Sequence, residues 1–276
     1  MAYKTILVHI DASVRVGERI KIAADLAIDY KAHLIGLAST GLTQLSYLEG
    51  EVPGAYRDLV NSVSQKAKDS LSKFEDTART SGIRSFEKLL VDEDAGIAIC
   101  HHALYSDLVV IGQSDPAATA SFVRTDFPEY VVLHSDRPVL VVPYTGHFSS
   151  VATKVVIAWD GSKEAMQAVV ASIPFLQKAE EVRVVIYDPT AEQKEREPHI
   201  GNELAKYLAR FDINVEILIQ VSSRGLGNSL LSFAADCSAD LIVMGAFVHS
   251  RYREMFLGGM TNTMLSDMTI PVLFAH

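Results

Sequence analysis

Two short clusters in the second half of the chain have the residue types and spacing to hold an anionic ligand. Asp160-Gly161-Ser162 follows an apolar run directly, and Gly258-Gly259-Met260-Thr261 comes just before an expected helix. Paired glycines at a helix start let backbone N–H groups approach an anion closely, and the helix dipole adds about 0.5–2 kcal/mol. Thr261 offers a hydroxyl, and Arg251 or Arg253 offers a cation. The Asp160 carboxylate can accept from a base amino group or a ribose hydroxyl, so the set suits a nucleotide.

Short apolar runs that alternate with helical patterns would position these clusters. In the first half, strands are expected at 6–10, 33–38, 86–91, 108–111 and 140–142. In the second half, strands are expected at 155–159, 182–187, 215–221 and in the run that ends at Gly245. Helices are expected at 95–105, near Pro198 and at 227–237. Continuous apolar strands alternating with helices predict an α/β fold with a parallel sheet that is covered on both faces.

Ligands of open α/β sheets bind beyond the carboxyl ends of the strands, where the strand order reverses. Asp160 follows the first expected strand of the second half, and Gly245 ends the fourth. If these two strands are neighbours, both clusters line one crevice. The glycine pair and the aspartate would then act on the same ligand.

The two halves of the chain resemble each other. Asp11-Ala12-Ser13 matches Asp160-Gly161-Ser162 at an offset of 149, and Asp107–Gly112 matches Asp240–Gly245 at an offset of 133. The difference between the offsets indicates an insertion in the first half, between about residues 40 and 85. We therefore expect a duplication with two tandem doubly wound domains, residues 1–146 and 152–276.

Composition limits the class of protein. With 34 acidic and 25 basic residues, the net charge of −9 disfavours nucleic acid as the main partner. No stretch of about 18 apolar residues is present, so no membrane span is expected. The two cysteines, Cys100 and Cys237, are expected to be buried core thiols in a reducing compartment. Together these features favour a soluble cytoplasmic protein.

Taken together, these motifs resemble the universal stress protein family, in its tandem form. The resemblance rests on Asp160-Gly161-Ser162, Asp240-Leu-Ile-Val-Met-Gly245, His249-Ser250-Arg251, Arg253-Glu254, Gly258-Gly259-Met260-Thr261 and Ile270-Pro271-Val272-Leu273. It implies a five-stranded parallel sheet in each half. It also implies a crevice that in some members binds ATP through a Gly-x2-Gly-x9-Gly-Ser/Thr loop. Association is implied through edge strands, as an internal pseudo-dimer and a homodimer.

The family's loop matches the second half in part. Gly245 fits the first glycine and Gly258 the third, whereas Val248 stands in place of the second glycine. Gly259 stands where Ser or Thr is usual, and Thr261 follows two residues later. The resemblance further implies Asp160 as the adenine-side aspartate. The full set of candidate nucleotide-binding residues is Ala158, Asp160, Gly161, Ser162, Ile186 (through its backbone), Gly245, Val248, His249, Arg251, Gly258, Gly259, Met260 and Thr261.

The loop matches the first half poorly. Gly112 is followed by Gln113-Ser114-Asp115-Pro116, which places Asp115 where the second glycine belongs. A carboxylate about 4 Å from a phosphate costs about 4 kcal/mol at an effective dielectric near 20. We therefore expect no triphosphate in the first half. Its crevice is expected to be empty, filled by side chains or used by another ligand.

Several of these residues also have structural interpretations. Asp160 can equally be a helix cap, and Asp11 with Ser13 is expected to be only a cap. Trp159 is expected to pack at the seam between the domains. His101 and His102 lack the ligand spacing of a metal site.

No catalytic set emerges, because neither a Gly-x4-Gly-Lys-Ser/Thr loop nor a Gly-x-Ser-x-Gly elbow is present. The sequence thus predicts a stress-response protein whose second half binds ATP, with or without Mg²⁺. It would act by a change of conformation or association, with at most slow ATP hydrolysis. The alternative is a nucleotide-free adaptor that binds a protein partner or an apolar small molecule.

Overall fold

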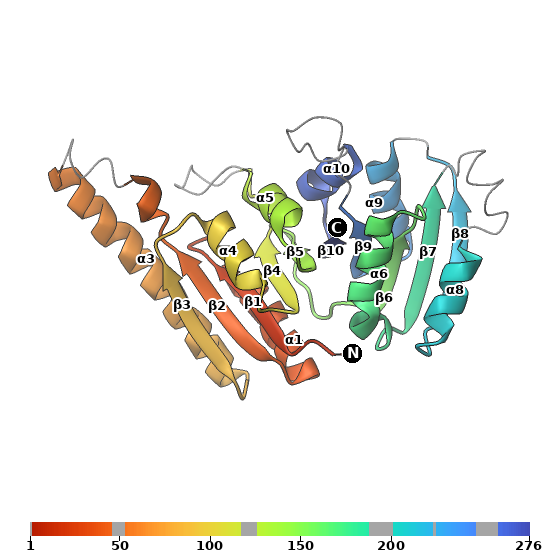
Figure 1. Ribbon diagram of the computed structural model, residues 1–276, viewed down its shortest axis with the longest axis horizontal. Helices are drawn as coiled ribbons and strands as arrows, with labels where there is room; N and C mark the ends of the chain where they lie inside the picture. The colour runs from red at the N-terminus through yellow and green to blue at the C-terminus, as the bar shows by residue number, and fades with distance from the viewer. Residues whose placement is uncertain (1, 46–52, 117–125, 188–200, 223–224, 247–258) are drawn as a thin grey trace. The chain divides into compact units, whose positions relative to one another are not determined.

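The computed structural model describes residues 2–45, 53–116, 126–187, 201–222, 225–246 and 259–276. These residues form two compact units, 2–139 and 140–276. The division falls inside a short strand, and the polar segment expected as the linker follows that strand. In each half of the chain, helices flank a sheet of parallel strands (Figure 1). The predicted α/β fold is therefore confirmed.

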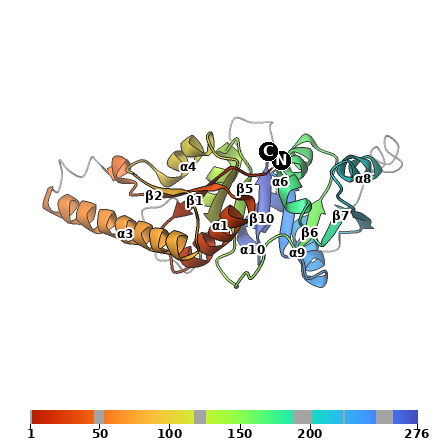
Figure 2. The same cartoon turned by 90° about the horizontal axis from the view of Figure 1, so that it is seen from below.

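The sheet of the first half has the strand order β3-β2-β1-β4-β5. Its strands are β1 (Thr5–Ile10), β2 (His33–Ser39), β3 (Phe86–Val91), β4 (Leu108–Gly112) and β5 (Val139–Val142). Its helices are α1 (Val16–Tyr30), the short η1 (Leu42–Leu45), α3 (Pro53–Thr80), α4 (Ala95–Ala103) and α5 (Phe127–His134). Helices α1 and α3 pack together on one face and α4 and α5 on the other (Figure 2).

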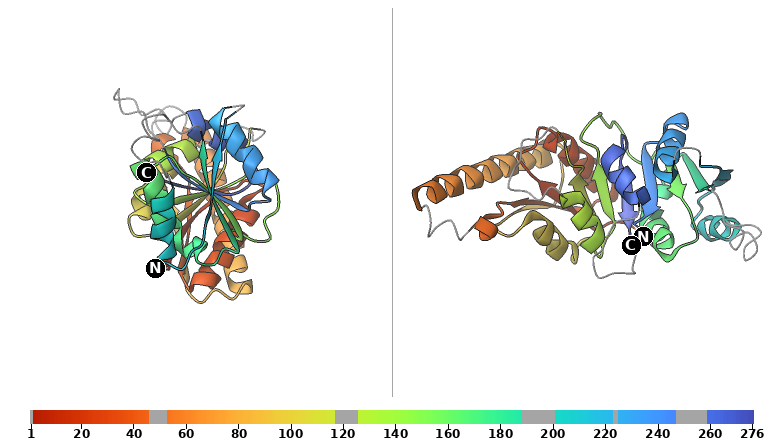
Figure 3. Two further views of the ribbon diagram at one scale, coloured as in Figure 1. Left: turned by 90° about the vertical axis from the view of Figure 1, so that its right-hand side faces the viewer. Right: turned by 90° about the horizontal axis from the view of Figure 1, so that it is seen from above.

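The second half repeats this order as β10-β9-β6-β7-β8. Its strands are β6 (Lys154–Ala158), β7 (Glu181–Tyr187), β8 (Glu216–Gln220), β9 (Leu241–Gly245) and β10 (Val272–Ala275). Its helices are α6 (Lys163–Leu176), α8 (Asn202–Ala209), α9 (Leu226–Asp236) and α10 (Gly259–Asp267). Figure 3 shows α6 and α8 on one side of the strands and α9 on the other, and α10 packs against α9.

The cores follow from the apolar runs. The interior strands β4 and β9 are buried along Leu108–Ile111 and Leu241–Met244, because helices cover both of their faces. The strand order reverses beside β1 in the first half and beside β6 in the second. The residues that follow β1, β4, β6 and β9 therefore lie where ligands of this fold class bind.

The observed elements differ from the expected ones in a few places. The helix expected at 95–105 ends at Ala103, and the strand expected at 155–159 ends at Ala158. The helix start expected near Pro198 lies outside the described residues, and α8 begins at Asn202. The insertion of the first half falls largely in α3, which runs for 28 residues. The extra length of this helix explains why the motifs before it match the second half at an offset of 149 and those after it at an offset of 133.

Two further observations concern composition. Cys100 and Cys237 are only half-buried, so neither is the core thiol that was expected. In the described part of the chain, no helix combines the length and the apolar character that a bilayer crossing requires.

Candidate functional site

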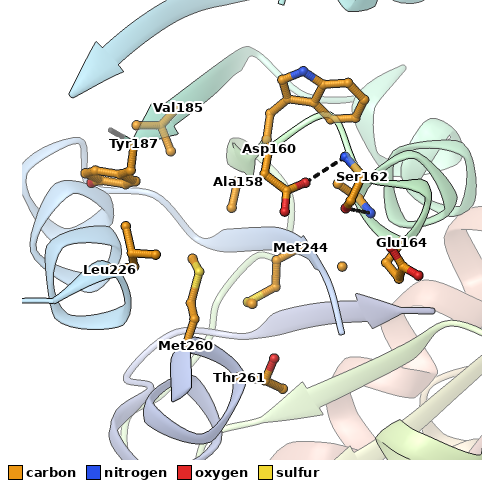
Figure 4. Close-up of a pocket in the computed structure, with 13 residues that line it drawn as sticks. Ala158, Asp160, Ser162, Glu164, Val185, Tyr187, Leu226, Met244, Met260 and Thr261 are labelled. Carbon is orange, nitrogen blue, oxygen red and sulfur yellow. Dashed lines mark hydrogen bonds between the residues drawn. The ribbon is translucent and has the colours of Figure 1, made fainter. Parts of the chain in front are cut away.

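A pocket of about 120 Å³ opens in the second half at the carboxyl ends of β6, β7 and β9 (Figure 4). This is about ten times the ~10–15 Å³ that one water molecule needs on the same measure. The sheet end contributes Ala158, Trp159, Asp160, Val185, Tyr187, Met244 and Gly245. The helix starts contribute Ser162, Glu164, Ala165, Leu226, Met260 and Thr261. The pocket therefore lies where the strand order predicts a ligand.

A tight turn after β6 sets the position of Asp160. Gly161 adopts a φ of 77°, which a side chain would strongly disfavour, and lets the chain reverse into α6. The Ser162 hydroxyl accepts a hydrogen bond from the Ala165 N–H at 3.1 Å and so caps α6. The Asp160 carboxylate accepts the Ser162 N–H at 2.9 Å. Asp160 therefore braces the turn, while Ser162 supplies the cap.

The opposite wall of the pocket comes from β9 and α10. Gly245 ends β9 so close to α6 that a Cβ at this position would lie 2.6 Å from the Ala165 nitrogen. Gly259 begins α10, and Thr261 is fully buried in the first turn of that helix. The start of α10 thus faces the turn that carries Asp160, as the two sequence clusters predict.

Apolar groups dominate the remainder of the lining. Val185, Leu226, Met244 and Met260 contribute hydrocarbon and thioether surface. Tyr187 lies at one end, where its hydroxyl donates a hydrogen bond to the Ser229 carbonyl at 2.9 Å. Burial raises the pKa of Tyr187 to about 12, so the phenol is neutral at physiological pH. This end of the pocket suits a flat apolar group better than a charged one.

The charged groups among the described lining residues are both acidic. Asp160 lies near the middle of the pocket, and Glu164 lies in the first turn of α6 (Figure 4). Two carboxylates favour hydroxyl or amino donors and cations as neighbours. In the described parts of the chain, no group of three or more His, Cys, Asp or Glu residues has the arrangement of a metal site.

Six of the candidate residues from the sequence line the pocket, namely Ala158, Asp160, Ser162, Gly245, Met260 and Thr261. Gly161 and Gly259 are their chain neighbours and do not line it. Val248, His249, Arg251 and Gly258 lie outside the described residues. One expectation needs correction, because Ile186 is not part of the lining. Trp159, which was expected to pack at the domain seam, is a lining residue that was not among the candidates.

The side chain of Ile186 lies on the opposite face of β7 from those of Val185 and Tyr187, because successive side chains of a strand point to opposite faces. It is 1% exposed and pairs with Ile219 of β8, while its neighbours Val185 and Tyr187 line the pocket. The sequence analysis missed Glu164, Ala165, Val185, Tyr187, Leu226 and Met244. Strand alternation could have indicated Val185 and Tyr187 once residues 182–187 were placed beside β6.

The corresponding place in the first half is filled by a side chain. Arg19 of α1 is 3% exposed, and its Nε donates to the His9 carbonyl at 2.7 Å. Its Nη2 lies 2.8 Å from the Asp11 carboxylate. The guanidinium also packs against Gly112, where any Cβ would collide with it. Of the three expected states of this crevice, the structure shows filling by a side chain.

Aromatic packing completes this cluster in the first half. The His9 and Phe127 rings lie 4.5 Å apart. Burial lowers the pKa of His9 to about 4. Burial alone would raise the pKa of Asp11, but Arg19, His9 and the hydrogen bonds from Ser13 outweigh it and hold this pKa well below its usual value. The expectation that Asp11 and Ser13 only cap a helix is wrong, because α1 begins after Arg15 without a side-chain cap.

Comparison with known proteins identifies the family to which this sequence is similar. The sequence model described as the universal stress protein family matches residues 2–143 and again residues 152–276. A universal stress protein of Synechocystis is 26% identical over 221 residues, which cover 76% of this chain and 71% of that protein.

Solved structures agree with the fold. The crystal structure of a universal stress protein from Archaeoglobus fulgidus is similar with a TM-score of 0.75 at 16% identity, covering 98% of this chain and 97% of that one. A functionally unknown protein from Pseudomonas aeruginosa is similar with a TM-score of 0.59 at 16% identity, covering 99% and 92%. With the family model matching both halves, this chain belongs to the universal stress protein family and carries two copies of its domain.

Proposed function

We propose that the second domain, residues 152–276, binds an adenine nucleotide, and that the protein acts in a stress response through the resulting change of conformation or association. The observation that supports this most directly is the pocket at the ends of β6, β7 and β9. It combines an apolar end, a central carboxylate and a helix start. A nucleotide presents a flat base, hydrogen-bonding groups and an anion in the same order.

Each part of the ligand has a suitable partner. The base lies against the apolar end, near Val185 and Tyr187. Asp160 accepts a hydrogen bond from a base amino group or a ribose hydroxyl. The phosphate groups lie toward Gly259 and Thr261, where the N–H groups at the start of α10 point outward from the helix.

Magnesium would complete this arrangement. Glu164 and Asp160 raise the energy of a bare triphosphate, by about 4 kcal/mol for one charge pair at about 4 Å. Mg²⁺ binds carboxylate and phosphate oxygens and would offset this repulsion. The protein would thus bind Mg·ATP more tightly than free ATP, and it would act through binding without turnover.

The first domain, residues 1–146, contributes no second nucleotide in this proposal. Arg19 occupies the space beside Gly112 and is paired with Asp11. Opening that crevice would leave the buried Arg19 guanidinium without its partner, the partly exposed Asp11 carboxylate, and an unpaired buried charge costs several kcal/mol. We therefore expect one nucleotide per chain.

The only tryptophan of the chain, Trp159, lines the pocket and makes a direct test feasible. Tryptophan fluorescence is measured while ATP is added with and without Mg²⁺, and calorimetry gives the stoichiometry. We expect a saturable change with one nucleotide per chain. No response at millimolar ATP in either assay would refute the proposal.

A second candidate function is a nucleotide-free adaptor that binds an apolar small molecule. The lining favours it in one respect, because both charged groups among the described lining residues are carboxylates. Mass spectrometry of small molecules released from the denatured purified protein separates the two functions. A nucleotide supports the first, whereas an uncharged apolar compound supports the second.

A further inference from the structure

We propose that Tyr187 binds the base of the ligand by stacking its ring against it. This inference rests on the proposed nucleotide site and adds to it a residue that contacts the base. Tyr187 is the last residue of β7 and lies at the end of the pocket away from Glu164 (Figure 4).

The phenol of Tyr187 is fixed before any ligand arrives. Its hydroxyl donates to the Ser229 carbonyl in α9, and this bond joins the end of β7 to a helix on one face of the sheet. Because the hydroxyl proton is used there, Tyr187 offers a ligand its ring and no hydrogen-bond donor. A ring held in place loses little conformational freedom on binding, which favours stacking.

The neighbours of Tyr187 in the pocket lining are also apolar. Leu226 lies next to it and is 43% exposed, although it is a large apolar side chain beside a pocket. Met260 lies between this end and Thr261 (Figure 4). Aromatic rings and thioethers are polarizable and interact well with flat heteroaromatic groups. A base in this position would cover Leu226 and contact the ring of Tyr187.

The first half lacks this ring. In the strand register, Leu37 pairs with His9 and Val185 pairs with Ala158, so Ser39 is the counterpart of Tyr187. The Ser39 hydroxyl donates to the Glu93 carbonyl within its own domain. The aromatic ring therefore occurs at the position that lines the pocket described above, whereas its counterpart in the first half is a serine, as expected for a group that serves a ligand.

The test compares ligands with and without a base. The wild-type protein and the variants Y187A, Y187L and Y187F are titrated with ATP, adenosine and inorganic tripolyphosphate, with Trp159 fluorescence and calorimetry as readouts. We expect Y187A to weaken the binding of ATP and adenosine by equal factors of about 5–150, which correspond to the ~1–3 kcal/mol of base–aromatic stacking. Tripolyphosphate affinity should stay unchanged. Y187F should bind ATP and adenosine slightly more weakly than the wild type, because it keeps the ring but loses the hydrogen bond that holds it. Y187L should lie between Y187A and Y187F.

The outcomes separate this inference from the function on which it rests. Unchanged or tighter adenosine binding in Y187A would overturn the role of Tyr187. ATP binding by the wild type would still support the nucleotide site in that case. An equal loss for tripolyphosphate would also overturn it, because that would indicate general damage to the pocket. If the wild type binds neither ATP nor adenosine, both proposals fail. If Y187A does not fold, the contrast between Y187L and Y187F decides.

Discussion

Asp11 and Asp160 occupy matching turns after the first strand of each half, but their surroundings differ. Asp11 is paired with a buried arginine, and a histidine and a phenylalanine pack beside that pair. Asp160 braces its own turn and lines a pocket. The offset of 149 residues that aligns the two aspartates places Ala168 opposite Arg19. A carboxylate at the same point of the fold is thus satisfied internally in one half and faces a pocket in the other.

Removal of the arginine should have the largest effect on this contrast. We expect R19A to lower the free energy of unfolding of the first domain by about 3–5 kcal/mol, because Asp11 loses its buried partner. Urea unfolding combined with hydrogen exchange would localise the loss. The control is K21A, since Lys21 forms an exposed pair with Asp25 that contributes about 1 kcal/mol at most. An equal loss in the two variants would contradict the structural role of Arg19.

The first domain should also be more sensitive to acid. His9 has a folded pKa of about 4 against the usual 6.5, so below pH 6.5 the unfolded chain takes up a proton that the folded chain excludes. Stability is therefore highest above pH 6.5 and falls by about 3 kcal/mol toward pH 4. The depressed pKa of Asp11 adds a further loss as the pH falls below about 4, because the unfolded carboxyl is protonated first.

Urea unfolding at pH 7, 5.5 and 4 measures this slope. The control is H9A, which places at position 9 the residue found at the matching Ala158 of the second half. This variant should lose the slope between pH 6.5 and 4, whatever its stability at pH 7. A slope that persists in H9A would show that other groups cause the acid sensitivity.

A matched pair of carboxamide variants tests which aspartate faces a ligand. We expect D160N to weaken ATP binding about 10-fold, because the amide keeps the oxygen that accepts the Ser162 N–H but loses the charge. D11N should leave ATP affinity unchanged. Calorimetry on both variants provides the measurement. Equal affinities for D160N and the wild type would remove Asp160 from the site.

The smallest expected difference concerns the two serines. S162A should destabilise the second domain by about 1 kcal/mol through loss of the cap on α6. S13A should cost less, since Ser13 donates to Asp11 and α1 has no side-chain cap. Urea unfolding of the two variants would decide, and a larger loss in S13A would contradict the capping assignment.

Much of the fold could be predicted from the sequence for a clear physical reason. Strands that are buried on both faces must be apolar throughout, and runs such as Leu108–Ile111 show this without any structural information. The duplication then placed the two turns after β1 and β6 at equivalent points. Asp160 and Thr261 could be assigned to one crevice because they follow strands that are neighbours in this fold class.

The rest of the site could not be predicted, because it depends on contacts between distant segments. Arg19 lies in an amphipathic helix, where a single arginine usually faces solvent, and its burial follows from the nearness of Asp11 and Gly112. In the sequence, Tyr187 resembles a core residue at the end of an apolar strand. Strand alternation assigns it to the pocket side only once β7 is known to lie beside β6.

Gly112 and Gly245 occupy the same motif position, yet each is small for a different reason. Gly112 leaves room for a guanidinium, and Gly245 leaves room for the backbone at the start of α6. Substitution of either one would therefore damage the packing of its own domain even without a ligand. Reduced activity of a glycine variant at these positions cannot be counted as evidence for a phosphate contact, and a test of the loop must use residues whose loss leaves the fold intact.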